Sequence, residues 1–298
     1  MVVLTQDVLR KRRWRLWAGL LAAAALAGLF AGLYQNANDK PLEVAMPGAS
    51  APLPPPLPAW LANAVTPPDA RGKPRIALVI DDLGVNGDVA ARAVALKGPV
   101  TLAFLAYAGN LPQQETAARQ AGHELLLHVP PGMHSPSLAS GLDGSAANPT
   151  PEEAQRRLVW DLNRMQDSVG IDMPTITGAD RQSTAIVMSE LKNRGLLFLD
   201  NQGDAGTSAA AHDAAHDAAH DTGVPYVAGD MRIDASGDMA AQFVQLEAIA
   251  RKNGAAIAIV SGTGPSLAAI KSWLPSLVGK GLVLTPLSDV VRTRNPAS

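Results

Sequence analysis

The sequence predicts an α/β domain built on parallel strands, and two observations support this fold class. From residue 75 onward, short runs rich in Val, Ile and Leu alternate with longer stretches of helical character. This alternation is typical of βα units around a buried parallel sheet. The composition, 47% apolar and 17% charged, indicates a folded chain with a core. Residues 74–298 therefore suit one barrel-like or open α/β domain.

Eight apolar runs are the predicted strands, and the residues between them predict helices. Thr150, Pro151 and Glu153 form the N-terminal signature of a helix that runs to about residue 168. A later helix is predicted to begin at Ser236 and to end before Gly254. Polar residues just after the strands are candidates for a site, because ligands bind at the carboxyl ends of parallel strands. The strands are predicted at residues 76–80, 100–105, 125–129, 171–177, 196–199, 224–228, 255–260 and 282–284.

The N-terminal residues are predicted to lie outside this domain. A basic segment, residues 1–15, precedes an uncharged apolar run at 16–34, which as a helix spans about 28 Å and can cross a bilayer. The basic flank favours a cytoplasmic N-terminus. The expected location is therefore a bacterial inner membrane, crossed once, with the C-terminal domain in the periplasm. Secretion after signal-peptide cleavage at residues 25–27 is the alternative, and a core helix of a cytoplasmic enzyme is a third interpretation.

Residues 35–73 are rich in proline, which removes helical hydrogen bonds and favours extended polyproline conformations. We interpret the segment as a linker that holds the domain away from the membrane, and a proline-rich ligand for a protein partner is the alternative. The predicted organisation is thus a basic N-terminus (1–15), a membrane segment (16–34), a linker (35–73) and one domain (74–298).

Charge and cysteine content exclude several functions. The net charge is −2, and the sequence holds no nucleic-acid-binding motif, so we expect no nucleic acid partner. The chain has no cysteine, which excludes disulfides, thiolate metal sites and cysteine nucleophiles. Any metal must be held by His, Asp, Glu or the backbone.

Adjacent carboxylates, Asp81 and Asp82, end the first predicted strand. Neighbouring carboxylates repel each other unless one is protonated or a cation lies between them, so the pair suits a metal ligand beside a general base. The alternative is a turn in which one of them caps the helix that begins near Asn86. His128 ends the third predicted strand, where it suits zinc or another divalent transition metal, or is a hydrogen-bonded structural histidine.

Three stretches together resemble the divergent polysaccharide deacetylase family. They are RIALVIDDLG at 75–84, PVTLAFL at 99–105 and AGHELLLHVP at 121–130, and RGLLFLD, AAIAI and LTPLS follow at 194–200, 255–259 and 284–288. The resemblance implies a distorted (β/α) barrel and metal-assisted removal of N- or O-acetyl groups from a glycan. It also implies that Asp81 is the general base, and that Asp82 and His128 bind a divalent metal, most simply zinc. Such a metal polarises the acetyl carbonyl and activates the water that Asp81 deprotonates.

The chain departs from the family pattern where the resemblance implies histidines, because Pro174 and Ser261 stand at two such positions. A serine of ordinary pKa cannot replace an imidazole as an acid near neutral pH. The hypothesis that follows is a member with weak deacetylase activity or none.

The metal site is also short of ligands. Asp82 and His128 are two protein ligands, whereas a catalytic zinc usually has three. Asp172, Asp200 and His134 are the possible third ligands.

A four-residue repeat, HDAAHDAAHD, occupies residues 212–221 and places His212, His216 and His220 on one helical stripe. Imidazoles four residues apart can chelate a transition metal, so these residues are candidates for an auxiliary metal site. The alternative is a solvated helix lengthened by repetition.

Two functions are compatible with this sequence. One is an exported, metal-dependent deacetylase that acts on peptidoglycan or another envelope glycan, supported by Asp81, Asp82 and His128. The other is a catalytically inactive module of the same fold that binds a glycan or an envelope protein partner, supported by Pro174 and Ser261.

Overall fold

The computed structural model describes residues 56–130, 151–174, 181–201 and 209–295. These belong to one compact unit that spans residues 56–298. The predicted segments 1–15 and 16–34, most of 35–73, and His134 lie outside the described residues. Within the described ranges, no helix has both the length and the apolar character needed to cross a bilayer.

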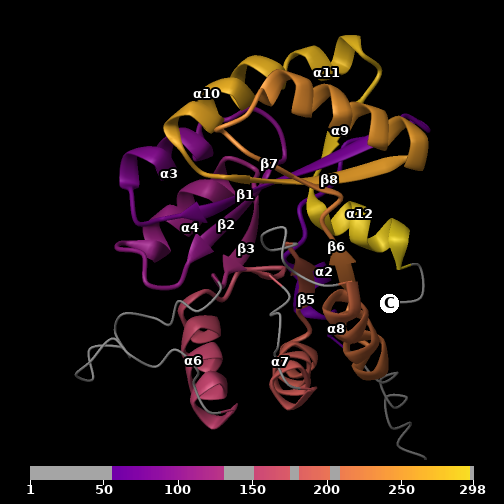
Figure 1. Cartoon of the computed structure of the whole chain (residues 1–298). Helices are drawn as coiled ribbons and strands as arrows, with labels where there is room; N and C mark the ends of the chain where they lie inside the picture. The colour runs from indigo at the N-terminus through magenta and orange to yellow at the C-terminus, as the bar shows by residue number, and fades with distance from the viewer. Residues whose placement is uncertain (1–55, 131–150, 175–180, 202–208, 296–298) are drawn as a thin grey trace, which may run out of the picture. The chain divides into compact units, whose positions relative to one another are not determined.

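One curled sheet of parallel strands forms the centre of the unit (Figure 1). All eight predicted strands are present, and β7 is an additional short strand. From one edge to the other the order is β6 (Tyr226–Ala228), β5 (Leu197–Asp200), β4 (Gly170–Met173), β3 (Glu124–His128), β2 (Thr101–Leu105), β1 (Arg75–Leu83), β8 (Ala255–Ser261) and β7 (Met231–Ile233), while β9 (Val283–Thr285) pairs with β1.

The two edges of the sheet are joined by one chain segment, residues 226–233. Its first part, β6, pairs with β5, and its second part, β7, pairs with β8 at the opposite edge. Between the two parts, Gly229 N donates to Asp200 O at 2.9 Å and Asp230 N donates to Ile257 O at 2.9 Å. The predicted barrel-like domain is therefore confirmed as a parallel α/β half-barrel, curled so that a single segment contacts both edges.

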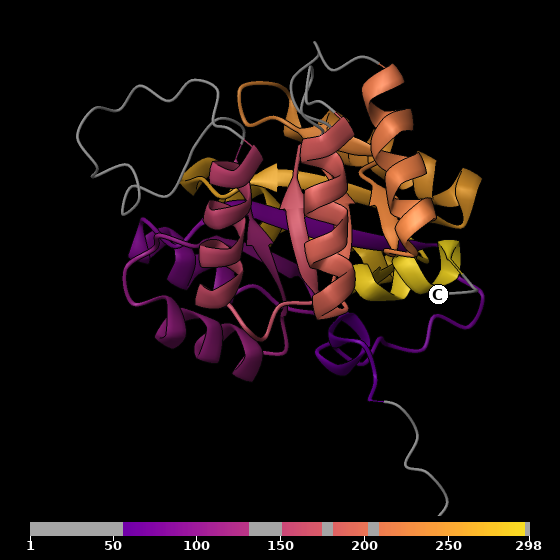
Figure 2. The same cartoon turned by 90° about the horizontal axis from the view of Figure 1, so that it is seen from below.

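Helices cover the outer face of the sheet, and α6, α7 and α8 lie side by side (Figure 2). The predicted helix at residue 151 is α6, which ends at Arg164. The helix predicted to begin at 236 begins at Met239, because Asp238 accepts hydrogen bonds from Ala240 N and Ala241 N and so caps α9. The helices are α2 (Ala59–Ala62), α3 (Gly87–Val94), α4 (Leu111–Gln120), α6 (Pro151–Arg164), α7 (Arg181–Arg194), α8 (Ala209–Thr222), α9 (Met239–Asn253), α10 (Gly264–Trp273), α11 (Ser276–Gly279) and α12 (Leu287–Arg294).

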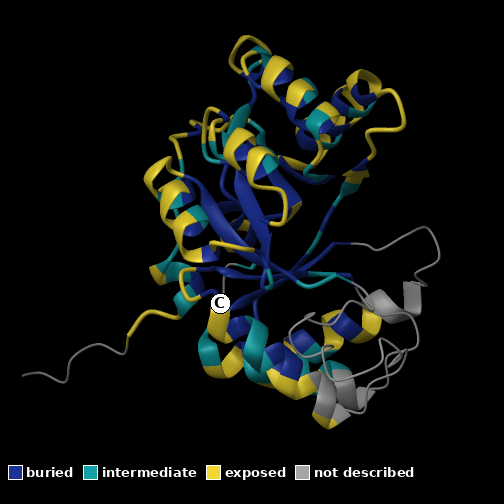
Figure 3. Cartoon of the chain, turned by 90° about the vertical axis from the view of Figure 1, so that its left-hand side faces the viewer, coloured by how far each residue is buried: buried dark blue, intermediate teal, exposed yellow. Residues whose placement is uncertain are grey.

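Alternation along the strands divides the apolar side chains into two clusters. Strand residues such as Ile76 and Leu78 pack against the covering helices, whereas Ala77 and Val79 form an inner cluster with α12 and Trp60. The strands are buried on both faces, and the helices are exposed on their outer sides (Figure 3). Because side chains alternate along a strand, this division determines which polar residues point to the inner face.

Residues 56–73, which the sequence assigns to the linker, pack on the domain. The Trp60 side chain is 2% exposed within the inner cluster, and Trp60 N donates to Gly195 O at 2.8 Å. Asn63 Nδ2 donates to Ser168 O at 2.9 Å. The compact unit thus begins near residue 56 rather than 74. The reason is that the large apolar indole ring of Trp60 is buried in the domain, although the segment around it is rich in proline.

Glu115 on α4 makes the stability of this unit depend on pH. It is 9% exposed, and its Oε1 has no hydrogen-bond partner among the described residues. Burial, with the nearby Asp167 carboxylate, raises the pKa of Glu115 from 4.5 to about 7 against the opposing Arg164. The raised pKa favours folding below pH 4.5, and this contribution is lost as the pH rises through 7.

Glu115→Gln is therefore expected to stabilise the protein more at pH 8 than at pH 5. The difference between the two pH values is on the order of 2 kcal/mol, because Gln removes the cost of ionising a buried carboxyl. Urea unfolding of both proteins at each pH measures it. A gain that is the same at both pH values would show that Glu115 titrates normally.

Candidate active site

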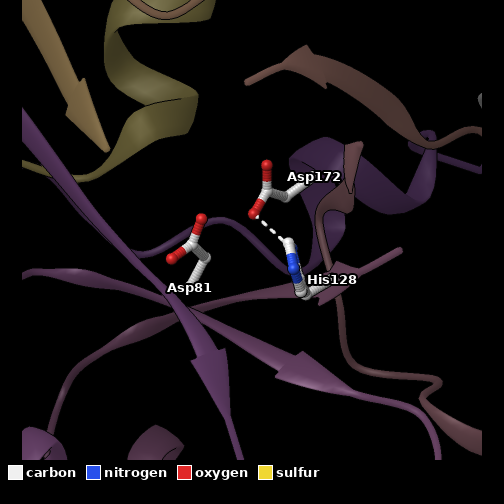
Figure 4. Close-up of side chains that lie close together, drawn as sticks. All are labelled: Asp81, His128 and Asp172. Carbon is white, nitrogen blue, oxygen red and sulfur yellow. Dashed lines mark hydrogen bonds and ion pairs between the residues drawn. The ribbon is translucent and has the colours of Figure 1, made fainter. Parts of the chain in front are cut away.

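Three buried side chains converge on the inner face at the carboxyl ends of their strands: Asp81 from β1, His128 from β3 and Asp172 from β4 (Figure 4). One ligand atom of each lies within 4.8 Å of the other two. The sequence predicted sites at Asp81 and His128, and Asp172 was one of three candidates for a third ligand. The structure therefore brings Asp172 to this group.

Asp82 reaches the same group because β1 is irregular at its end. In a regular strand, adjacent side chains point to opposite faces, but the register between β1 and β2 shifts between Ile80 and Leu83. Asp82 has a left-handed φ of 58°, and bulges of this kind redirect side chains. Its Oδ1 lies 3.2 Å from Nε2 of His128.

The alternative that one of these aspartates caps the following helix is wrong. The N-terminal cap of α3 is Asn86, whose side chain accepts from Asp88 N and Val89 N. The Asp82 side chain is 47% exposed, whereas that of Asp81 is fully buried. Asp82 thus lies at the open side of the group, with Asp81 beneath the surface.

His128 lies between two carboxylates. Its Nδ1 is 2.8 Å from Oδ2 of Asp172, and its Nε2 faces Asp82. Burial alone would lower the pKa of His128, but Asp172 and Asp82 raise it to about 10. The hydrogen bond to His128 lowers the pKa of Asp82, despite partial burial. Two carboxylates thus hold the imidazole ring from its two nitrogen atoms.

Arg232 on β7 completes the group, and the sequence did not predict it as a site residue. Its Nη1 is 2.8 Å from Oδ2 of Asp81, and its Nη2 donates to Ser261 Oγ at 2.7 Å. Ser261 pairs with Asp81 in the register of β1 and β8. Burial and Asp172 raise the pKa of Asp81, and Arg232 and His128 act against this rise.

The donors in this group fit a divalent cation. Three carboxylates, Asp81, Asp82 and Asp172, face two cationic side chains, and Oδ1 of both buried aspartates has no hydrogen-bond partner among the described residues. Buried anionic oxygens without partners are costly. The 3.2 Å between Asp82 Oδ1 and His128 Nε2 also suits two ligands of one zinc ion, since bonds of about 2.0–2.2 Å separate neighbouring ligands by about 3–3.5 Å.

Asp200, another possible third ligand, does not join this group. Asp200 is the last residue of β5 and points to the same face as Phe198, which packs against the helices. The Oδ2 atom of Asp200 accepts a hydrogen bond from Tyr226 Oη at 2.8 Å. His134 lies outside the described residues. Pro174, at a position where the resemblance implies a histidine, is buried directly after β4.

The histidine repeat forms part of α8, as predicted. Ala215 and Ala219 are buried against the sheet, while the side chains of His216 and His220 are 61% and 82% exposed. The side chain of His212 lies outside the described residues, and the group around Asp81 is the one potential metal cluster of three or more ligands in the described ranges. The auxiliary metal site stays a prediction.

Comparisons with known proteins agree with this fold. The family model described as divergent polysaccharide deacetylase matches residues 78–291. The uncharacterized protein YibQ of Escherichia coli (strain K12) is 28% identical over 203 residues, which are 66% of this chain and 60% of that relative. The chain thus matches less than two thirds of the relative's length.

Two solved structures resemble the chain over most of their own length. The uncharacterized protein ATU2773 from Agrobacterium tumefaciens C58 has a TM-score of 0.66 at 26% identity, covering 78% of this chain and 95% of that one. A putative cellobiose-phosphate cleavage protein (EF3048) from Enterococcus faecalis V583 has a TM-score of 0.52 at 11% identity, covering 73% and 99%. The second likeness concerns the fold alone. The residues matched by the family model include every member of the group around His128.

Proposed function

Because this chain belongs to the divergent polysaccharide deacetylase family, we propose that it removes acetyl groups from a glycan of the bacterial envelope by metal-assisted hydrolysis. The observation that carries the proposal is the position of His128. One ring nitrogen faces the exposed carboxylate of Asp82 and the other faces the buried carboxylate of Asp172. Asp81 lies beside them, paired with Arg232.

Asp82 and Nε2 of His128 would hold the divalent metal, for which zinc is the first choice. When bound, the metal polarises the acetyl carbonyl and makes a water more acidic. Both ligand side chains are on strand ends, which keep them in fixed positions. The exposed side of Asp82 gives a substrate access to this pair.

Asp81 would act as the general base. It takes one proton from the water whose oxygen forms the new bond to the acetyl carbon. Arg232 holds Oδ2 of Asp81 in place, so Oδ1 is the atom that accepts the proton. Breaking the bond between the acetyl carbon and the sugar nitrogen or oxygen releases acetate. The sugar atom takes up a proton from solvent, to which Asp81 returns the proton that it took. Ser261 of ordinary pKa supplies none near neutral pH, so we expect slow turnover.

The location proposed for this activity is the periplasm. Residues 16–34 would anchor the chain in the inner membrane, with the basic residues 1–15 in the cytoplasm. Peptidoglycan is then the substrate that lies within reach. Secretion after signal cleavage is the alternative, and the support for both is the sequence.

Acetate release by the purified full chain tests the proposal. With Zn²⁺ added, acetylated chitin oligosaccharides or O-acetylated peptidoglycan should release acetate, and a chelator should stop the reaction. Asp82→Asn should lose both stoichiometric zinc and acetate release, because it removes the anionic ligand. Asp88→Asn, which changes an exposed aspartate on α3, is the matched control. Absence of acetate release by the zinc-loaded wild-type chain would contradict the proposal.

A second candidate function is a glycan-binding module without turnover. It is favoured by Pro174 and Ser261, which stand at positions where the resemblance implies histidines. In that case, wild-type and Asp81→Asn chains should retain the same glycan on a column, and neither should release acetate. An envelope protein partner is the other ligand of such a module.

A further inference from the structure

One buried carboxylate of the site, Asp172, is neither the base nor a ligand in the proposed chemistry. It is fully buried in β4, and its Oδ2 lies 2.8 Å from Nδ1 of His128. We propose that Asp172 is a positioning residue, which holds the Nδ1 proton of His128, directs Nε2 toward Asp82 and strengthens the imidazole as a metal ligand. This inference rests on the proposed function.

The sheet fixes the distance between Asp172 and His128. The two residues are direct partners in the register of β3 and β4, and Val129 N donates to Asp172 O at 2.8 Å. On its other side, β4 approaches β5 so closely that a Cβ on Gly170 would lie 2.1 Å from Leu197 O. Asp172 therefore stands on a strand that is held from both sides, as a positioning residue requires.

Asp172 lies on the buried side of the imidazole ring of His128, and Asp82 lies on its exposed side. The side chains of Asp172 and His128 are 0% and 3% exposed, while that of Asp82 is 47% exposed. A ring whose Nδ1 is held from the buried side presents Nε2 to the accessible side. The ion that enters from solvent then meets Asp82 and Nε2 first, and Asp172 acts through the ring.

The competing arrangement makes Asp172 a direct ligand. An ion could lie among Asp81, Asp172 and a ring nitrogen of His128, because one ligand atom of each lies within 4.8 Å of the other two. Binding at Nδ1 would require His128 to give up its hydrogen bond to Asp172, and an ion beside Asp81 would lie toward Arg232, which already pairs with that carboxylate. The ion pair and the hydrogen bond both favour the positioning role.

Metal titration of the full-length Asp172→Asn chain tests this role. Asn keeps the size of the side chain and an acceptor oxygen but removes the charge. Loss of such a supporting partner should weaken Zn²⁺ binding by about 10- to 100-fold. The stoichiometry and the visible absorption of bound Co²⁺ should stay as in the wild type, because the ligands are unchanged.

Asp200→Asn is the matched control. Asp200 is a fully buried aspartate at the end of the neighbouring strand, in the register position opposite Met173, but it faces the helices and Tyr226. Its substitution should leave the zinc affinity unchanged. An equal loss of affinity in both variants would overturn the inference, because it would reflect a general effect of buried charge.

Further results would also be decisive. Wild-type affinity in Asp172→Asn would overturn the inference, and so would loss of the bound ion or a Co²⁺ spectrum with one ligand fewer. A wild-type chain that binds no metal would instead overturn the proposed function. In the metal-free wild-type protein, proton NMR should show a downfield, slowly exchanging Nδ1 proton of His128. Its absence would overturn the inference without any variant.

Discussion

Asp81→Asn is expected to lower acetate release by about 10²- to 10⁴-fold, the usual contribution of a general base. Asn has the shape of Asp but cannot take a proton from water. Because Asp81 is not a proposed ligand, zinc stoichiometry should be retained. Initial rates of acetate release by the zinc-loaded full chain, together with zinc content after desalting, measure both quantities.

Asp69→Asn is a suitable control for this experiment. Asp69 also pairs with an arginine, Arg71, but both side chains are largely exposed. Its substitution should leave the rate unchanged. If Asp81→Asn lost its zinc together with its activity, Asp81 would be a ligand rather than the base. If it kept most of its activity, another group would be the base.

Trp60→Ala is expected to destabilise the protein by about 3–5 kcal/mol, the usual effect of removing a large buried aromatic side chain. The indole belongs to the inner cluster with α12, so its removal would leave a cavity there. Urea unfolding of the full chain, followed by circular dichroism, measures the loss.

Leu57→Ala on the same segment is the matched control. The Leu57 side chain is 66% exposed, so its truncation should change stability by less than about 0.5 kcal/mol. If Trp60→Ala were as mild as Leu57→Ala, residues 56–73 would be the loose linker that their prolines suggest.

The sequence was sufficient to predict the strands that carry most of the site. The runs that become β1 and β3 are apolar on both faces, and their polar ends, Asp81 and His128, stood out for that reason. By contrast, β7 has three residues, Met231–Ile233, and is too short to show a period. The sequence therefore did not predict that Arg232 lies on a strand of the sheet and forms an ion pair with Asp81.

The choice between Asp172 and Asp200 also needed the structure. Both follow apolar runs, and sequence does not fix which residue of a short buried strand faces inward. In the folded chain, the side chain of Asp172 points to the inner face of the sheet and that of Asp200 points to the outer face. The direction of the Asp82 side chain depends on a local shift in the register between β1 and β2, and no pattern of residue types predicts such a shift. The predicted start of the domain at residue 74 is too late, because the proline-rich composition of residues 35–73 indicates a linker whereas Trp60 is buried in the domain.

The attachment of residues 56–73 determines at which end of the sheet the preceding chain joins this domain. Trp60 and Val65 contact Gly195 and Glu124, which stand at the amino ends of β5 and β3, whereas Asp82 and His128 stand at carboxyl ends. Residues 56–73 therefore join the domain at the pole opposite the candidate site. A fusion partner joined directly before residue 56 would therefore attach at the amino-end pole and leave the carboxyl-end pole accessible.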